Sequence, residues 1–180
     1  ETLKKIGTLC KKYHVIVVSD EIHCELCAPG CNYIPFASVS EDCQNNSITC
    51  IAPTKTFNIA GLQTAIVSVP NENLRHKVWR GLNEVAEPNA FAIQAAIAAF
   101  TKGESWLEEL REYLQGNKEC VLDYVEREIP QLSVVASDAT YLLWLDCKKI
   151  TEYTKEFVEF IRKKTGLYLS EGSQFGDNGK

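Results

Sequence analysis

The chain has 180 residues, of which 45% are hydrophobic and 24% are charged, and its net charge at pH 7 is −5. This length and composition are typical of a globular protein that forms one large domain or parts of two. The negative charge argues against nucleic acid or an anionic membrane surface as a partner, since both attract basic proteins. No apolar run approaches the roughly 20 residues that a membrane-spanning helix needs, so we expect no membrane segment.

The first half of the chain predicts helix and buried strand in alternation. Residues 1–14 carry apolar side chains at helical spacing. Short β-branched runs follow at residues 15–20, 47–53 and 64–70, and such runs are typical of strands buried on both faces of a parallel sheet. We therefore predict an α/β fold, in which ligands bind outside the carboxyl ends of the strands.

The second half predicts long helices and a small α+β layer. The expected helices are residues 71–80, 88–103, 104–128 and 151–166, and the expected strands are residues 132–135, 140–146 and 167–170. This change of character predicts two parts. Residues 1–80 would be half of a large ligand-binding domain, and residues 81–180 would be connecting helices and a small C-terminal domain.

The sequence also predicts a fragment. It contains no methionine, begins at Glu1 within a helical pattern and stops after Lys180 without a closing element. We therefore expect a piece of a longer protein.

The positions of the eight cysteines suggest whether the protein works in a reducing or an oxidising compartment. Half of them lie inside expected helices and strands, where free thiols behave as small hydrophobic side chains. These are Cys10, Cys50, Cys120 and Cys147. Because this pattern differs from the disulfide framework of a secreted protein, we predict a reducing, cytoplasmic setting.

Residues 19–31, SDEIHCELCAPGC, allow two interpretations. Cys24, Cys27 and Cys31 beside His23 have the spacing of a metal or iron–sulfur site. Alternatively, the functional residue is Asp20, at the end of an apolar run, although an acid there can also simply cap a turn.

A second candidate lies in residues 51–65, IAPTKTFNIAGLQTA. Lys55 stands between a predicted buried strand and a glycine-containing turn, among apolar residues. Burial there would favour the neutral amine that Schiff-base chemistry requires. An ordinary loop lysine is the alternative at this point.

Four stretches carry a family resemblance: SDEIH, APTKTFNIAGLQ, ATYLLWLD and SEGSQFGDNG. In this order and spacing they resemble the pyridoxal-phosphate (PLP) enzymes of the aspartate aminotransferase fold. The resemblance is strongest to the MalY/PatB branch of carbon–sulfur β-lyases and covers nearly the whole chain. It implies a partial aminotransferase-like large domain and a truncated small domain.

The resemblance implies roles for individual residues. Lys55 would bind pyridoxal 5'-phosphate covalently and move the substrate Cα proton, and Asp20 would pair with the pyridine nitrogen. Ile22 would pack on a ring face, and His23 would stand where the fold usually has a tyrosine. Thr54 is the nearby hydroxyl for the phosphate, because Ala52 occupies the usual serine position. The implied cofactor-binding set is Asp20, Ile22, His23, Thr54 and Lys55, with Lys55 catalytic.

The resemblance also decides between the two interpretations of residues 19–31. The cysteines follow the aspartate in a loop that holds no metal in this family. A structural zinc site also usually needs a second cysteine pair at similar spacing, which Cys43 and Cys50 do not supply. We predict no metal site.

The activity implied is α,β-elimination of cystathionine or a related cysteine S-conjugate to thiol, pyruvate and ammonia. The alternatives are an aminotransferase of the same fold and a non-catalytic regulatory module. The partners implied are an amino-acid substrate and, for the full-length protein, a second copy in a homodimer. The phosphate loop and the substrate-carboxylate arginine would lie outside residues 1–180, so we expect this piece alone to be inactive.

Overall fold

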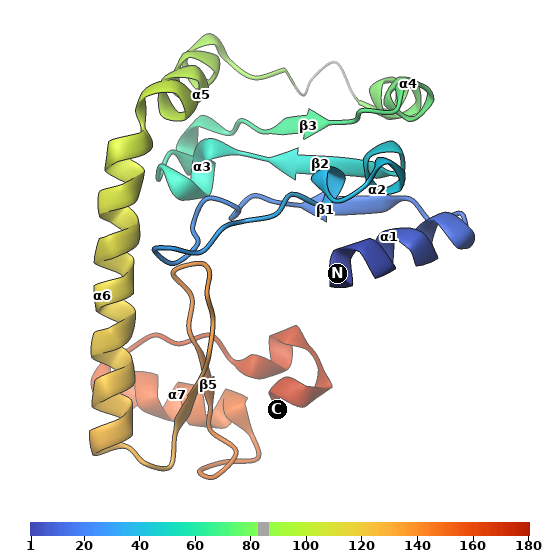
Figure 1. Ribbon diagram of the computed structural model, residues 1–180. Coiled ribbons are helices and arrows are strands. Elements are labelled where there is room, and N and C mark those ends of the chain that lie inside the picture. Colours follow the sequence, from blue (N-terminus) through green and yellow to red (C-terminus); the bar gives the residue numbers. More distant parts are fainter. Residues whose placement is uncertain (83–86) are drawn as a thin grey trace. The chain divides into compact units, whose positions relative to one another are not determined.

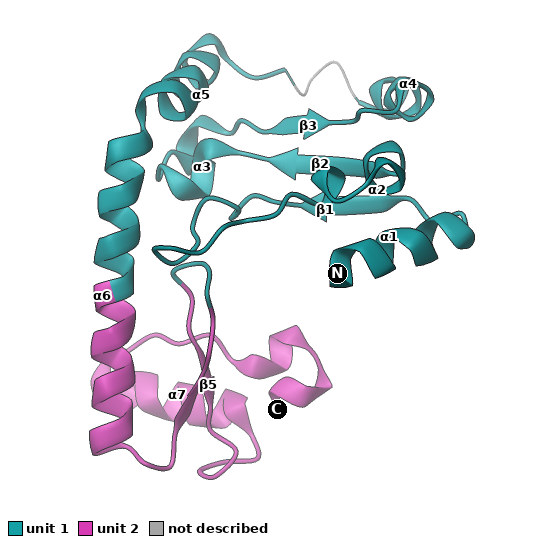
Figure 2. Ribbon diagram, viewed as in Figure 1, with its two compact units in different colours: residues 1–115, 138–141 teal, residues 116–137, 142–180 magenta. Residues whose placement is uncertain are grey.

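The structure is a computed structural model that describes residues 1–82 and 87–180. Two compact units divide the chain: residues 1–115 with 138–141 form unit 1, and residues 116–137 with 142–180 form unit 2 (Figure 2). The division falls within helix α6 (Glu104–Glu128). The domain boundary expected near residue 80 stays a prediction, and residues 83–86 of the expected second domain lie outside the described residues.

Unit 1 alternates helices and strands along the chain (Figure 1). In order it contains α1 (Thr2–Lys12), β1 (Val17–Asp20), α2 (Glu41–Asn45), β2 (Ser47–Ile51), α3 (Pro53–Thr56), β3 (Ile66–Ser68), α4 (Glu72–Gly81), α5 (Ala90–Lys102) and the first half of α6. Asparagine caps begin two of these helices. The Asn71 side chain, just before α4, accepts a hydrogen bond from the Leu74 N–H. The Asn89 side chain, just before α5, accepts one from the Ala92 N–H. These bonds satisfy backbone N–H groups that have no partner within the first turn of a helix.

The three strands of unit 1 form one sheet in the order β1-β2-β3. β1 and β2 are parallel, with Asp20 beside Cys50. β3 is antiparallel to β2, with Ile66 beside Ile51. The expectation that all three runs are buried on both faces was wrong. Val18 is 64% exposed and Val67 is 43% exposed, because no described element covers their faces of the sheet.

Three close contacts hold helices of unit 1 in place. α1 lies against α2 at Gly7, where an added Cβ would collide with the Sγ of buried Cys43. The residue after α3, Phe57, stacks on Trp106 of α6 with ring centroids 5.5 Å apart. Gly103 joins α5 to α6 so close to the Phe57 ring that a Cβ there would also collide. These contacts fix the turn that contains α3 against α5 and α6.

Unit 2 is a small α+β layer. It contains the second half of α6, the antiparallel pair β4 (Ser133–Val135) and β5 (Trp144–Asp146), and α7 (Thr154–Thr165). The α7 start is tied to the end of the chain, since Thr154 Oγ1 donates to the Gly179 carbonyl at 3.0 Å.

The predicted helices are confirmed in the described residues within a few positions at their ends. The predicted strand at residues 167–170 was wrong. These residues leave α7 through Gly166 in the left-handed region and pair with no described strand. β-Propensity alone does not make a strand without a partner. None of the helices in the described ranges is long and apolar enough to cross a membrane.

Candidate active site at the carboxyl ends of β1 and β2

Asp20 is the last residue of β1, and its side chain is exposed. Its Oδ1 accepts a hydrogen bond from the Ile22 backbone N–H at 3.2 Å. The carboxylate therefore caps the turn that follows the strand, as the simpler interpretation expected. This capping role leaves the charge at the sheet edge, where it is also available to a ligand.

Lys55 lies in the short helix α3, which begins two residues after the end of β2. Pro53, Thr54 and Thr56 of this turn are buried, whereas Lys55 is exposed. The expectation that Lys55 is buried in apolar surroundings was therefore wrong for this chain. The turn places its three other side chains in the core and presents the lysine outward.

Asp20 and Lys55 are brought to the same edge of the sheet by strand direction. β1 and β2 are adjacent and parallel, so their carboxyl ends lie at one edge. Figure 1 shows β2 running directly toward α3 at this edge. One carboxylate and one amine from two separate parts of the sequence therefore lie at the same edge of the sheet.

The other predicted residues lie in the same two loops. Ile22 and His23 follow Asp20 and are partly buried, and the His23 ring contacts the Tyr141 ring at a centroid distance of 5.9 Å. Thr54 is 9% exposed, and its backbone carbonyl accepts from the Ile59 N–H. The structure thus locates all five predicted residues at the end of β1, in the loop after it or in α3 after β2, and their roles stay predictions.

Sequence reasoning missed Glu21, a buried carboxylate with 4% exposure. It accepts hydrogen bonds from the Ser19 hydroxyl at 2.8 Å, the Phe36 backbone N–H at 3.0 Å and the Tyr33 hydroxyl. A buried carboxylate is stable only with such partners. Side-chain alternation along the strand was the available signal, because an outward Asp20 implies an inward Glu21.

Two titratable groups near Glu21 have raised pKa values. Burial, followed by the charges of Glu25 and Glu21, raises the pKa of Cys24 to about 11. Burial, followed by the charge of Glu21 and its hydrogen bond, raises the pKa of Tyr33. Both groups are therefore neutral at physiological pH. In the described ranges, no three His, Cys, Asp or Glu side chains are arranged to hold a metal ion.

One hydroxyl beside the lysine lacks a partner. Thr56 Oγ1 is buried and makes no hydrogen bond to the residues that the structure describes. Such a group costs roughly 1–3 kcal/mol when left unpaired. Its side chain faces the core, on the side of the turn away from the exposed Lys55.

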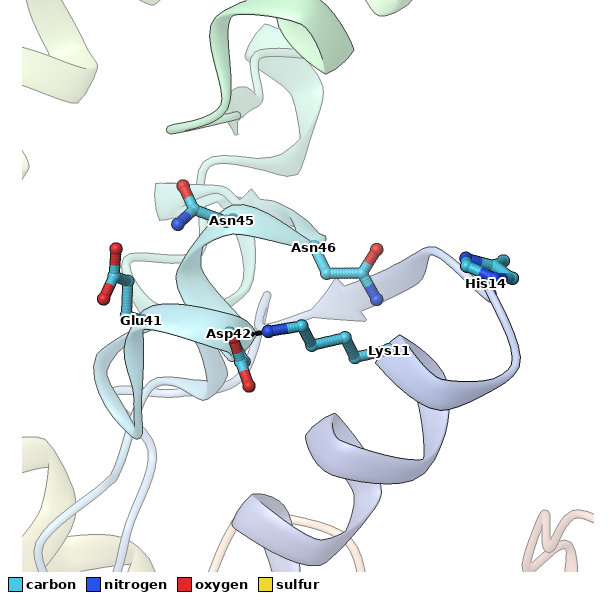
Figure 3. Close-up of a pocket in the computed structure, with 6 residues that line it drawn as sticks. All are labelled: Lys11, His14, Glu41, Asp42, Asn45 and Asn46. Atoms are coloured by element: carbon cyan, nitrogen blue, oxygen red, sulfur yellow. Dashed lines mark hydrogen bonds and ion pairs between the residues drawn. The ribbon is translucent and has the colours of Figure 1, made fainter.

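A surface pocket of about 500 Å³ lies away from these residues. Figure 3 shows it between the end of α1 and α2, lined by Lys11, His14, Glu41, Asp42, Asn45 and Asn46. These residues precede β1 and β2, so the pocket is at the opposite edge of the sheet from Asp20 and Lys55. Its Lys11–Asp42 ion pair is exposed to solvent, where such pairs contribute little.

Comparison with known proteins decides the family. The sequence profile of the family described as "Aminotransferase class I and II" matches residues 1–179. The chain belongs to this family. It is 40% identical over 182 residues to cystathionine beta-lyase PatB of Bacillus subtilis (strain 168), covering 100% of this chain and 47% of PatB. The chain thus spans about half the length of the curated relatives it matches.

Solved structures agree with this assignment. Cystalysin from Treponema denticola, which contains a pyridoxal 5'-phosphate cofactor, superposes with a TM-score of 0.93 at 28% identity, covering 98% of this chain and 45% of that one. The PLP-bound C–S lyase from Staphylococcus hominis superposes with a TM-score of 0.85 at 34% identity, with coverages of 98% and 45%. The predicted fold class, a partial aminotransferase-like domain with a small α+β part, is confirmed.

Proposed function

We propose that the full-length protein is a PLP-dependent carbon–sulfur β-lyase. It would eliminate thiol from cystathionine or a related cysteine S-conjugate and leave pyruvate and ammonia. The observation that carries this proposal is that Asp20 and Lys55 lie at the carboxyl ends of two adjacent parallel strands, at the same edge of the sheet. The 40% identity to a cystathionine beta-lyase supports the reaction type.

The residues present fit pyridoxal phosphate. Lys55 offers an exposed amine for the covalent link to an aldehyde. The Asp20 carboxylate supplies the opposite charge that stabilises a protonated ring nitrogen. When bound, the cofactor supplies an electron sink for the charge left at the substrate Cα.

The side chains of this chain would then divide the work. Lys55 takes the proton from the substrate Cα, and its position on a short turn lets the amine reach a ligand above the strand ends. Asp20 holds its negative charge toward the ring nitrogen while its other contact, to the Ile22 N–H, fixes the turn. His23 and Thr54 complete the set as residues beside the ring and the phosphate.

An aminotransferase of the same fold is the second candidate. Aspartate aminotransferase of Geobacillus stearothermophilus is 22% identical over 181 residues, well below the 40% identity to the lyase of Bacillus subtilis. The difference favours elimination over amino transfer. The two reactions share the removal of the Cα proton and differ in their later steps.

We further propose that the full-length protein is a cytoplasmic homodimer. All eight cysteines are free, which supports a reducing setting. Large apolar side chains such as Phe91 (82% exposed) and Val18 (64% exposed) lie uncovered in unit 1, which supports burial against further protein surface.

The deciding experiment uses the full-length protein with PLP and L-cystathionine. We expect stoichiometric pyruvate and thiol, and we expect borohydride reduction to attach the cofactor to Lys55. Lys55→Ala should abolish both, whereas Lys102→Ala, which removes an exposed lysine at the end of α5, should change neither. Amino transfer to a 2-oxo acid without pyruvate release would instead support the aminotransferase.

A further inference from the structure

The His23 imidazole has one aromatic neighbour in the described chain. Its ring meets the Tyr141 ring edge-on, with centroids 5.9 Å apart and planes 70° apart. This is the arrangement that aromatic rings prefer, since a positive ring edge meets a negative ring face. Tyr141 is 42% exposed, and the contact is between the two rings.

Tyr141 is held there by backbone contacts, not by sequence proximity. Residues 138–141 belong to unit 1, although the chain on both sides belongs to unit 2. Ala28 donates its N–H to the Asp138 carbonyl at 2.8 Å, and the Thr140 N–H donates to the Leu26 carbonyl at 2.6 Å. Between them, Cys27 and Ala139 form an isolated antiparallel bridge. The four residues are therefore fastened to the loop that follows Asp20.

Two further hydrogen bonds hold the loop that follows Asp20. The Arg111 guanidinium on α6 donates to the Glu25 carbonyl at 2.6 Å. Glu21 anchors the loop start to Phe36. The loop on which residues 138–141 rest is thus held by hydrogen bonds at two further points, Glu21 and Glu25.

The fastened segment carries backbone strain. Thr140 has φ of 64°, in the left-handed region that β-branched residues rarely adopt. Strain of this kind persists only where surrounding contacts enforce it, and it concentrates at functional sites. Here it lies one residue before the ring that meets His23, so the strained backbone sets the direction of Tyr141.

We infer that Tyr141 is a positioning residue for His23. The Tyr141 ring holds the imidazole in one orientation at the site edge, and the Thr140 backbone holds the Tyr141 ring. The inference rests on the proposed function for the role of His23 toward a ligand, but the ring contact itself can be measured without any ligand.

The test uses the full-length protein without cofactor, with histidines labelled at Cε1 for NMR, and the His23 signal assigned by its loss in His23→Gln. Tyr141→Ala should shift the His23 resonance, whereas Tyr141→Phe should keep it in place because it keeps the ring. Thr140→Pro forbids a positive φ and removes the N–H, so it should reproduce the Tyr141→Ala shift. Thr140→Gly tolerates the conformation and should retain the wild-type signal.

A matched control is Tyr113→Ala, which removes a 68% exposed tyrosine of unit 1 on α6. Its His23 signal should stay at the wild-type position. Circular dichroism checks that each variant is folded. An unchanged His23 resonance in folded Tyr141→Ala would overturn the inference.

With cofactor and cystathionine, Tyr141→Ala should lower kcat/KM by roughly tenfold, about what one lost edge-to-face ring contact allows. Failure of the wild-type protein to release pyruvate would count against the lyase proposal alone. The NMR result decides the His23–Tyr141 pair in either case. A shifted resonance with unchanged kinetics would overturn the part of the inference that links the pair to the ligand.

Discussion

Glu21 and Phe36 meet across the loop that follows β1: the Glu21 carboxylate accepts the Phe36 backbone N–H at 3.0 Å, across a separation of 15 positions. Both residues are buried. The contact closes residues 21–36 into a loop around one carboxylate, directly behind Asp20. The orientation of the candidate site therefore depends on a charged group that faces the core.

The first prediction concerns the tyrosine on this carboxylate. Folding raises the pKa of Tyr33, mainly through burial and then through the charge of Glu21. The contribution of Tyr33 to the free energy of unfolding is therefore fully present below about pH 10, the ordinary pKa of tyrosine. This contribution should be lost as the pH rises above that value, because only the unfolded chain then releases the proton easily. Urea unfolding from pH 8 to 11 should show a steeper loss for the wild type than for Tyr33→Phe. Parallel pH profiles would contradict the prediction.

The second prediction concerns thiol reactivity. With a pKa of about 11, Cys24 is almost entirely a thiol at pH 8, with roughly one thiolate per thousand molecules. Iodoacetamide should therefore label exposed Cys31 and Cys120 well before Cys24. Peptide mass spectrometry of a time course measures this order. Labelling of Cys24 first would show that its surroundings are not those described.

The third prediction concerns the charge at the end of β1. Asp20→Asn keeps an oxygen that can accept the Ile22 N–H, so the turn should survive. The lost charge should slow β-elimination about a hundredfold, which corresponds to ~3 kcal/mol of transition-state stabilisation. Steady-state kinetics of the full-length holoenzyme test it. A near-normal kcat in a variant with normal cofactor content would remove Asp20 from the mechanism.

The fourth prediction concerns the contact between α1 and α2. Gly7→Ala adds a methyl group where the buried Cys43 Sγ already lies, and overpacking of this kind costs about 1–3 kcal/mol. Cys43→Ala removes the obstructing sulfur. The double variant should therefore lose less unfolding free energy than the sum of the losses in the two single variants. Denaturant unfolding of the four proteins gives the coupling free energy. Strict additivity would mean that the two sites do not touch.

The fifth prediction concerns the 180-residue chain by itself. The family resemblance assigns the phosphate loop to residues before Glu1, and a helix N-terminus there would normally anchor the cofactor phosphate. We therefore expect this polypeptide to bind PLP much more weakly than the full-length protein and to lack lyase activity. Absorbance titration compares the two. Tight stoichiometric binding by the 180-residue chain would contradict this view.

The placement of Asp20 and Lys55 at one edge of the sheet could be predicted because the signal for it is local in sequence. Asp20 and Lys55 each follow an apolar run, and such runs place their next polar residue at a sheet edge. The antiparallel direction of β3 could not be predicted, because the run at residues 64–70 has the same composition whichever way it pairs. Nor could the exposure of Lys55, because the sequence does not show which side chains of the α3 turn face the core.

Contacts between residues far apart in the sequence could not be predicted either. Tyr141 meets His23 only because strained backbone at Thr140 rests on the loop after β1. Neither residue carries a local signal for the other. The burial of Glu21 could not be predicted for the same reason. Its hydrogen-bond donors at Ser19, Tyr33 and Phe36 come together only when the loop closes.

The parallel pairing of β1 with β2 has a consequence for how the chain folds. At the start of the pair, the Asn46 side chain reaches the Val15 carbonyl across 31 positions. A parallel pair cannot grow from a tight turn, so this whole loop must close before the first ladder hydrogen bond repays the entropy. Helix α6, whose hydrogen bonds are local, can form much earlier. Asp20 ends one strand of this pair and Lys55 follows the other, so we expect the sheet edge that carries them to form late in folding, after helix α6.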